Sequence, residues 1–188
     1  AARTISNASG NNIGTQTAVL SVAGYDASGP DSSAAYKYNG VVWSVSADLI
    51  KGRSAAGSAG TQNAALIFGG GDNGNTQSGL ISCTEKYNGS TWSETGNLPA
   101  AGKNTAGTGT QNAAIQAGRY CTPGSPPGAH GTETYLFDGN AWSDAGADLI
   151  TAGRRDAGFG GTYNAAVSVG GSPYPTGCRC VENWNGST

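Results

Sequence analysis

Residues 84–92 read TEKYNGSTW, which is the pattern of a β-hairpin: an alternating strand, an Asn-Gly turn and the start of a second strand. Asn-Gly favours a type I′ turn, in which both central residues adopt positive φ. Nearly the same words recur in AYKYNGVVW, which ends at Trp43, in TYLFDGNAW, which ends at Trp142, and in VENWNGST, which ends at Thr188. The chain therefore repeats one hairpin four times.

A second motif precedes each hairpin at the same period. GTQTA begins at Gly14, GTQNA begins at Gly60 and Gly109, and GTYNA begins at Gly161. The tryptophans Trp43, Trp92 and Trp142 are 49 and 50 residues apart. We expect one domain over residues 1–188, built from repeats of approximately 1–48, 49–97, 98–148 and 149–188.

Each repeat is predicted to contain four short antiparallel strands. In the second repeat these are the small-residue segment RSAAGSAG, the apolar segment AALIFGG, the alternating segment CTEKYN and the strand that carries Trp92. Four strands in about 49 residues predict an all-β fold, a β-propeller of four blades, with the glycine-rich strand innermost where the blades converge. The last blade is predicted to be incomplete, because the chain ends at Thr188, where its tryptophan strand would begin.

The two ends of the chain do not decide how the propeller closes. We expect a closed ring in which blade one packs against blade four and residues 1–4 run near the unfinished edge. The alternatives are that the chain is cut from a longer array or that another chain supplies the missing strand. The tryptophans that begin the outer strands are expected to pack between neighbouring blades.

The repeat resembles the kelch pattern, in which a di-glycine ends an apolar strand and an aromatic residue lies about five residues before a tryptophan. The wording of GTQNAALIFGG and TEKYNGSTWSETGNLP is similar to kelch-like arrays in structural and tail-fibre proteins of marine bacteriophages. This resemblance implies a fibre or capsid-decoration protein on a virion surface, with other virion proteins or a host-surface glycan or protein as partners. The first and third repeats depart from it, with Ala23-Gly24 and Gly118-Arg119 in place of the di-glycine.

Composition argues against several classes of partner. The chain has 10 Lys and Arg against 12 Asp and Glu, a net charge of −2, and no basic run that could neutralise phosphates, so no nucleic acid is expected. No apolar run approaches the length of a transmembrane helix, so no membrane insertion is expected. The absence of Met and the start at Ala1 indicate a processed product or a fragment.

Few residues are suited to catalysis. Copper radical oxidases with kelch propellers need two histidines as ligands, and this chain has only His130. The segment NGSTW matches the tail of a sialidase Asp-box, but Tyr87 occupies the aspartate position. No Ser/His/Asp set can be assembled from a single histidine. We therefore expect no enzyme activity, no cofactor and no metal site.

The cysteines and the recurring basic residues allow structural interpretations. Cys121 and Cys178 are predicted to form a disulfide between adjacent blades, while Cys83 and Cys180 are repeat-equivalent, too far apart to bond to each other, and interpreted as small buried residues. Basic residues recur near the start of the innermost strand, at Arg53, Lys103 and Arg154. They form either a positive ring that holds an anion or, the favoured interpretation, ion pairs with Asp48 and Asp148.

The loops between the second and third strands, here called the loop face, differ in length and chemistry while the framework around them repeats. Recognition is commonly placed on such loops. The candidate binding residues are Tyr25, Asp26, Asp72, Asn73, Asn75, Tyr120, His130 and Tyr174. They favour a non-catalytic extracellular binding or structural module on a virion surface. The second interpretation is a secreted carbohydrate-binding propeller, and the third is a propeller enzyme of the oxidase or sialidase type. The sequence is also compatible with a homo-oligomer.

Overall fold

The computed structural model describes residues 9–25, 31–72, 79–121, 130–151, 154, 156–171 and 179–187. Blade one contains β1 (Asn11–Thr15), β2 (Ala18–Val22), β3 (Ala35–Tyr38) and β4 (Trp43–Val45). Blade two contains β5 (Gly57–Thr61), β6 (Ala64–Phe68), β7 (Thr84–Tyr87) and β8 (Trp92–Thr95). Blade three contains β9 (Ala106–Thr110), β10 (Ala113–Tyr120), β11 (His130–Phe137) and β12 (Trp142–Asp144). Blade four contains β13 (Gly158–Thr162), β14 (Ala165–Val169) and β15 (Val181–Trp184).

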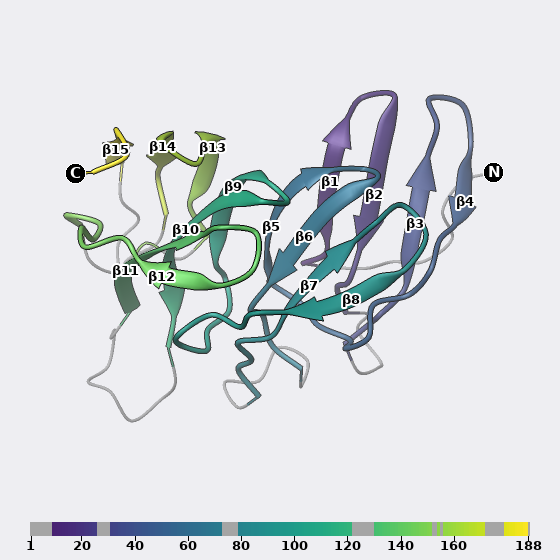
Figure 1. Cartoon of the computed structure of the whole chain (residues 1–188), viewed down its shortest axis with the longest axis horizontal. Coiled ribbons are helices and arrows are strands. Elements are labelled where there is room, and N and C mark those ends of the chain that lie inside the picture. The colour runs from purple at the N-terminus through teal and green to yellow at the C-terminus, as the bar shows by residue number, and fades with distance from the viewer. Residues whose placement is uncertain are drawn as a thin grey trace.

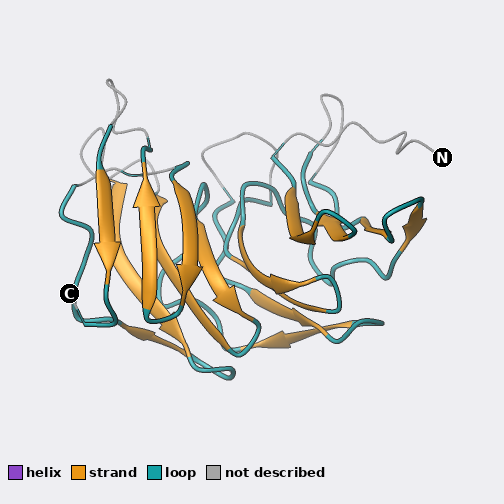
Figure 2. Ribbon diagram, turned by 90° about the horizontal axis from the view of Figure 1, so that it is seen from above, coloured by secondary structure: helices purple, strands orange, loops and turns teal. Residues whose placement is uncertain are grey.

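The strands form four antiparallel sheets, and each sheet follows the order of its strands in the chain. The first three sheets have four strands and the last has three. The described residues contain strands, turns and loops but no helix (Figure 2). The first strands of successive blades, β1, β5, β9 and β13, pack next to one another (Figure 1). The fold is therefore an all-β, four-bladed β-propeller whose last blade is incomplete, as predicted.

The hairpin turns differ from the predicted type I′ turn. In blade two the loop spans the four residues between Tyr87 and Trp92, and Gly89 has a φ of 95° while Asn88 is not among the residues with positive φ. The side-chain oxygen of Asn88 instead accepts hydrogen bonds from the backbone N–H groups of Ser90 and Thr91, both at 2.9 Å. The side chain therefore closes the turn, and only the glycine needs the left-handed conformation.

A chain of backbone hydrogen bonds links the centres of all four blades. Ala55 N–H donates to the carbonyl of Ser9 at 3.0 Å, Asn104 N–H to Ala55 at 2.7 Å and Asp156 N–H to Asn104 at 3.2 Å. All four residues have φ between 52° and 58°, a left-handed conformation that non-glycine residues seldom adopt. Each blade thus contains one residue in this strained conformation, and in blades two to four its N–H group donates to the equivalent residue of the preceding blade.

The glutamine of the GTQ motif, here called the turn glutamine, fastens blades two and three each to the blade before it. Gln62 Nε2 donates to the carbonyls of Val19 and Tyr38 at 3.0 and 2.7 Å. Gln111 Nε2 donates to the equivalent carbonyls of the next interface at 3.0 and 2.6 Å. One amide group therefore satisfies carbonyls from both the second and the third strand of the preceding blade.

A lysine of the third strand makes the opposite connection, towards the following blade. Lys37 Nζ donates to Asn63 Oδ1 and Gly89 O at 3.0 and 2.7 Å. In the next interface, Lys86 Nζ makes the same pair of contacts at 2.9 and 3.0 Å. Successive blades are thus clasped from both sides near the hairpin turns.

Two outer-strand tryptophans lie between blades, as predicted, and one does not. Trp92 and Trp142 are both 8% exposed. Trp92 Nε1 donates to Ala47 O and Trp142 Nε1 to Thr84 Oγ1, each at 3.0 Å and each into the preceding blade. Trp43 is half-buried and packs on Tyr38 of its own blade, because no described blade covers this face.

Blade one does not pack against blade four, so the predicted ring closure is wrong for the strands that the structure describes. The contact that joins β1 to β5, β5 to β9 and β9 to β13 has no counterpart between β13 and β1. The two blades lie at opposite ends of the view in Figure 1. Val45 of blade one and Val169 of blade four are accordingly 79% and 48% exposed. Blade four has no outer strand and carries Asn183 at the position of the clasping lysines, so it lacks the groups that join the other blades.

We expect Gly107→Ala to destabilise the fold by about 1–3 kcal/mol, because overpacking forces neighbouring side chains to move. A Cβ atom at Gly107 would lie 2.4 Å from the ring of Phe68, which comes from the preceding blade. Gly160→Ala is the control, since a Cβ atom at Gly160 would meet nothing within 4 Å. Urea unfolding of both variants measures the difference, and equal losses would contradict the close approach of blades two and three.

Candidate functional site

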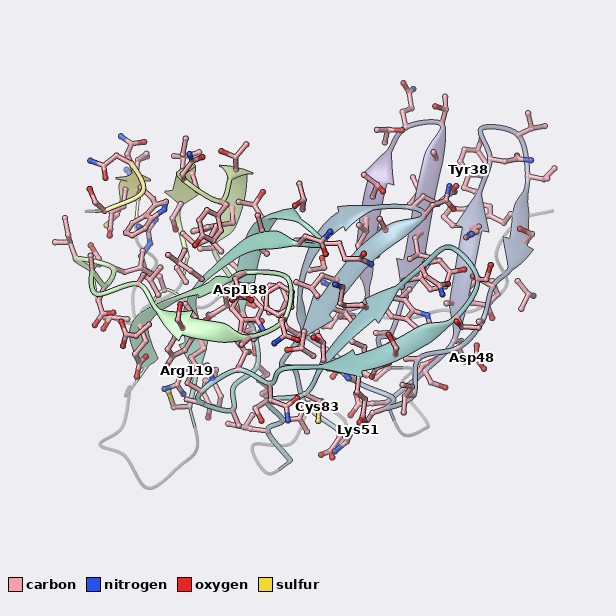
Figure 3. All side chains as sticks on the ribbon, in the orientation of Figure 1. Tyr38, Asp48, Lys51, Cys83, Arg119 and Asp138 are labelled. Atoms are coloured by element: carbon pink, nitrogen blue, oxygen red, sulfur yellow. The ribbon has the colours of Figure 1, made fainter. Side chains whose placement is uncertain are left out.

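The loop face lies at one end of the blades, where the chain leaves each second strand. Lys51, Cys83 and Arg119 mark this end in Figure 3. Of the predicted binding residues, the structure describes Tyr25, Asp72 and Tyr120, each at or just beyond the end of a second strand. Asp26, Asn73, Asn75 and Tyr174 lie outside the described residues.

The described loop-face residues have charged neighbours. Asp72 forms an ion pair with Lys51 at 2.8 Å, in which both side chains are partly exposed. The Nζ atom of Lys103 lies 5.6 Å from the centre of the Tyr120 ring, within the range of a cation–π contact. Tyr120 also pairs with His130 across β10 and β11. The loop face therefore combines aromatic rings with charged groups of both signs.

The predicted disulfide between Cys121 and Cys178 is corrected by the structure, in which Cys121 is a free thiol. The guanidinium of Arg119 holds the Cys121 sulfur beside β10, with Nη1 2.9 Å from Sγ. Cys83 is also free, as predicted. Cys180 is disulfide-bonded, and Cys178 lies outside the described residues.

Arg119 replaces the second glycine of the di-glycine and organises this part of blade three. Its Nη1 atom also donates to Ala101 O at 3.0 Å, and its Nη2 atom lies 2.8 Å from Glu133 Oε1. Blade three extends β10 and β11 to eight residues each around this group. The departure from the repeat thus provides a partly buried ion pair at the edge of the loop face.

Neither interpretation of the recurring basic residues is correct for Arg53 and Arg154. Arg53 is fully buried, so it cannot hold an anion at the mouth of a channel, and its partner is Glu85 rather than Asp48. Arg53 also donates to the carbonyls of Gly69 and Cys83 at 3.1 and 2.7 Å. Backbone carbonyls thus take up the remaining guanidinium hydrogens.

The Glu85 carboxylate also orders the connector from blade one. It accepts hydrogen bonds from the backbone N–H groups of Ile50 and Lys51 at 2.8 and 3.2 Å. Arg53 and Glu85 therefore join the connector, the second strand and the third strand in one buried network.

Blade four repeats this network. Arg154 is fully buried, lies 2.8 Å from Glu182 and donates to the carbonyls of Ser168, Gly170 and Cys180. Glu182 accepts hydrogen bonds from the connector N–H groups of Ile150 and Thr151 at 2.8 and 3.1 Å. The sequence contains a signal for these pairs. A Cys-x-Glu segment occurs only in the two repeats that have an arginine, Arg53 or Arg154, before the first strand.

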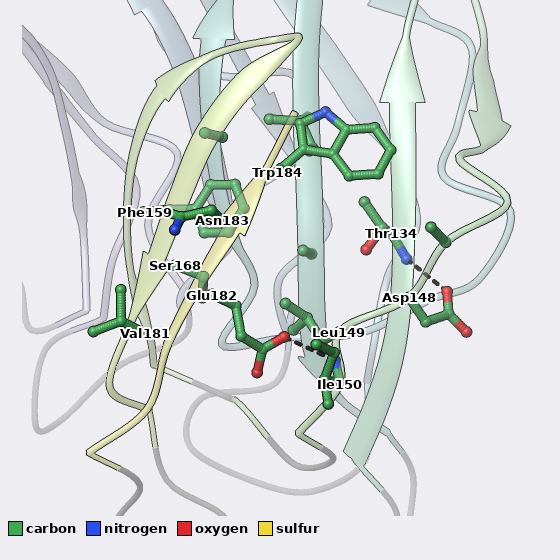
Figure 4. A pocket seen from close by; sticks show the side chains of 14 residues that line it. Thr134, Asp148, Leu149, Ile150, Phe159, Ser168, Val181, Glu182, Asn183 and Trp184 are labelled. Carbon is green, nitrogen blue, oxygen red and sulfur yellow. Dashed lines mark hydrogen bonds between the residues drawn. The ribbon is translucent and has the colours of Figure 1, made fainter. Parts of the chain in front are cut away.

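A cavity of about 210 Å³ lies between blades three and four (Figure 4). Ile115, Ala117 and Leu149 form an apolar side, and Trp184 closes one end. Thr134, Ser168 and Glu182 supply polar groups. This cavity was not expected from the sequence.

The Glu182 carboxyl at the cavity has a lowered pKa. Burial raises its pKa, but the hydrogen bonds from Ile150 and Thr151 and the charge of Arg154 outweigh burial, so the pKa lies below its ordinary value of 4.5. The folded structure therefore stabilises the ionised form of the Glu182 carboxyl.

In the part of the chain that the structure describes, no group of three or more His, Cys, Asp and Glu side chains could hold a metal ion. Those residues also include no helix suited to crossing a lipid bilayer.

No protein-family profile matches this chain, and no curated protein matches it significantly. The kelch and phage resemblance therefore has no support from these comparisons.

We expect Glu85→Ala to lower the free energy of unfolding by about 3–5 kcal/mol, because it leaves the Arg53 charge buried without a partner. Asp72→Ala breaks the partly exposed ion pair with Lys51 and should cost no more than about 1 kcal/mol. Denaturant unfolding of both variants measures the two effects. A loss in Glu85→Ala as small as in Asp72→Ala would show that the buried network does not hold the connector.

The lowered pKa of Glu182 predicts a pH dependence of stability. A carboxyl whose pKa is lower in the folded state stabilises the fold above its unfolded value of 4.5, and this contribution is lost as pH falls through the folded pKa. Unfolding experiments on the original chain and on Glu182→Gln, from about pH 7 to about pH 3, should show a smaller acid loss in the variant. Identical pH profiles would contradict this role of Glu182.

Proposed function

We propose that this β-propeller is a non-catalytic binding or structural module that acts outside the cell, on the surface of a virion. The observation that carries the proposal is the contrast between a repeated, tightly connected framework and a loop face that differs from blade to blade. The backbone links through Ala55, Asn104 and Asp156 hold the blade centres together. Loops on such a scaffold are presented in fixed relative positions, which favours recognition.

The use of the charged groups supports a non-catalytic role. Arg53, Arg154 and Arg119 are paired with glutamates inside or at the edge of blades, where they satisfy carbonyls and connectors. Catalytic acids and bases commonly lie in clefts, where their pKa values are shifted towards the working pH. The pKa of Glu182 is shifted in the opposite direction, away from neutral pH.

The kelch-like phage resemblance favours a virion surface as the setting, with virion proteins or a host-surface glycan or protein as the partner. The second candidate is a secreted carbohydrate-binding propeller. Tyr25, Tyr120 and the partly exposed Asp72 favour it, since flat rings and short polar groups suit sugars. Both candidates use the loop face, and they differ in where the protein is found.

Two measurements test the proposal. An antibody against the chain should label the surface of virus particles from the source that encodes it, and the protein should bind host cells or a glycan array. A variant with Tyr25→Ser, Asp72→Asn and Tyr120→Ser should lose at least about thirtyfold in affinity if these residues are binding hot spots. The control Val41→Ser lies on a hairpin turn and is 81% exposed, so it should bind like the original chain.

The outcomes separate the candidates. Glycan binding without virion labelling favours the secreted propeller. Equal binding by the loop-face variant and the control excludes the loop face, and turnover in oxidase or sialidase assays contradicts the non-catalytic role.

A further inference from the structure

One wall of the cavity between blades three and four is a row of blade-four side chains. Phe159 of β13, Ser168 of β14 and Glu182 of β15 lie opposite one another across three antiparallel strands. Residues directly opposite in such a sheet carry their side chains on the same face. All three line the cavity, and Trp184 continues the same face two residues further along β15 (Figure 4). Blade four therefore presents aromatic, hydroxyl and carboxylate groups to one space.

The opposite wall, from blade three, is mainly apolar. Ile115 and Ala117 of β10 are buried, and both line the cavity together with Leu149 of the connector. Thr134 lies opposite Ala117 in the sheet and is also buried. A molecule in this space thus contacts aliphatic carbon on one side and the row of blade four on the other.

The space beside Ala117 accompanies an exchange of side-chain size between two interfaces. Phe68 of blade two projects towards blade three, where its ring lies against Gly107. By strand register, Ala117 stands at the position of Phe68, and Phe159 at that of Gly107. The aromatic ring therefore comes from the following blade in this interface, and the β10 side contributes only a methyl group.

Ser168 is a buried polar residue whose hydroxyl the fold does not use. It is 2% exposed, and its hydroxyl oxygen has no hydrogen-bond partner in the described part of the chain. Blade two has the same arginine–glutamate network but places the apolar Ile67 at this position, so the network does not require a serine. Because buried hydroxyls without partners are uncommon, the Ser168 hydroxyl indicates a hydrogen-bonding group of a ligand.

Volume and charge define the kind of ligand. The cavity of about 210 Å³ exceeds the roughly 150 Å³ of an apolar cavity that binds benzene. A water molecule occupies roughly 30 Å³, so one water would satisfy the hydroxyl and leave most of the apolar wall without a contact. The ionised carboxylate of Glu182 disfavours anions and favours a molecule that donates a hydrogen bond.

We propose that the cavity binds a small, neutral, flat aromatic molecule with one hydrogen-bond donor, of the size of indole. The ring lies between the aliphatic wall of blade three and the rings of Phe159 and Trp184. Its donor reaches the hydroxyl oxygen of Ser168. The site is separate from the loop face and does not depend on the function proposed above.

Calorimetric titration of the full chain with indole tests the proposal. Indole should bind saturably with a Kd of about 1 mM or tighter. Indene, which has the same shape without the N–H group, should bind about two- to tenfold more weakly, the effect of one hydrogen bond. In NMR spectra the indole N–H signal of Trp184 should shift on binding, whereas those of Trp43, Trp92 and Trp142, which do not line the cavity, should not.

Three protein variants complete the test. Ser168→Ala should bind indole and indene with equal affinity, because the acceptor is gone. Ala117→Leu fills the cavity and should lose binding while its melting temperature stays equal or rises, as is common for cavity-filling substitutions. Ser90→Ala, on the exposed hairpin turn of blade two, is the matched serine control and should bind like the original chain.

Several outcomes would overturn the proposal. They are no saturable binding at millimolar indole, equal affinity of the original chain for indole and indene, and unchanged binding by a folded Ala117→Leu variant. If that variant does not fold, the comparison of Ser168→Ala with Ser90→Ala decides. N-acetyltryptophanamide carries the same ring on a peptide backbone. Binding of this compound as tight as that of indole would show that the site takes a polypeptide side chain, and would overturn the proposal as well.

Discussion

The fold depends on the interface between successive blades, and the turn glutamine is its central contact. A blade is a sheet of three or four short strands with two faces, and neither face is stable until a neighbouring blade covers it. Gln62 and Gln111 each donate two hydrogen bonds to the blade before them. Because each amide reaches both the second and the third strand, it fixes the height and the rotation of one sheet on the next. The buried tryptophans Trp92 and Trp142 lie in the two interfaces that have this contact.

The buried charges of this protein are structural. In blades two and four an arginine and a glutamate join the connector to the sheet, while Tyr36 and Tyr135 take the glutamate position in blades one and three. Burying such a pair costs hydration, and the pair is tolerated because each guanidinium and carboxylate also meets backbone groups. Those backbone groups belong to connectors and strand ends that would otherwise lack partners. The pairs thus set the path by which the chain passes from blade to blade.

The interface between blades three and four explains why a cavity lies there. Tyr163 stands at the position of the turn glutamine and Leu136 at the position of the clasping lysine, so both clasps of the earlier interfaces are absent. The outer tryptophan is absent as well. The Arg154–Glu182 pair and the backbone link between Asp156 and Asn104 are still present, but neither fills the space beside Trp184. The replacement of both clasping residues accompanies an apolar space beside Trp184.

Sequence alone determined the strands and their order, because the periodic Gly-Thr-Gln motif, apolar run, Asn-Gly turn and tryptophan each have a local physical meaning. It also indicated which blade is incomplete. Tertiary structure decided the partners: Arg53 pairs with Glu85 and not Asp48, and Cys121 lies beside Arg119 as a free thiol. It also decided that blade one stays apart from blade four and that a cavity lies beside Trp184. These features depend on how whole sheets lie against each other. The repeat in the sequence indicates the strand register within each blade, but it does not indicate the distances between side chains of different blades.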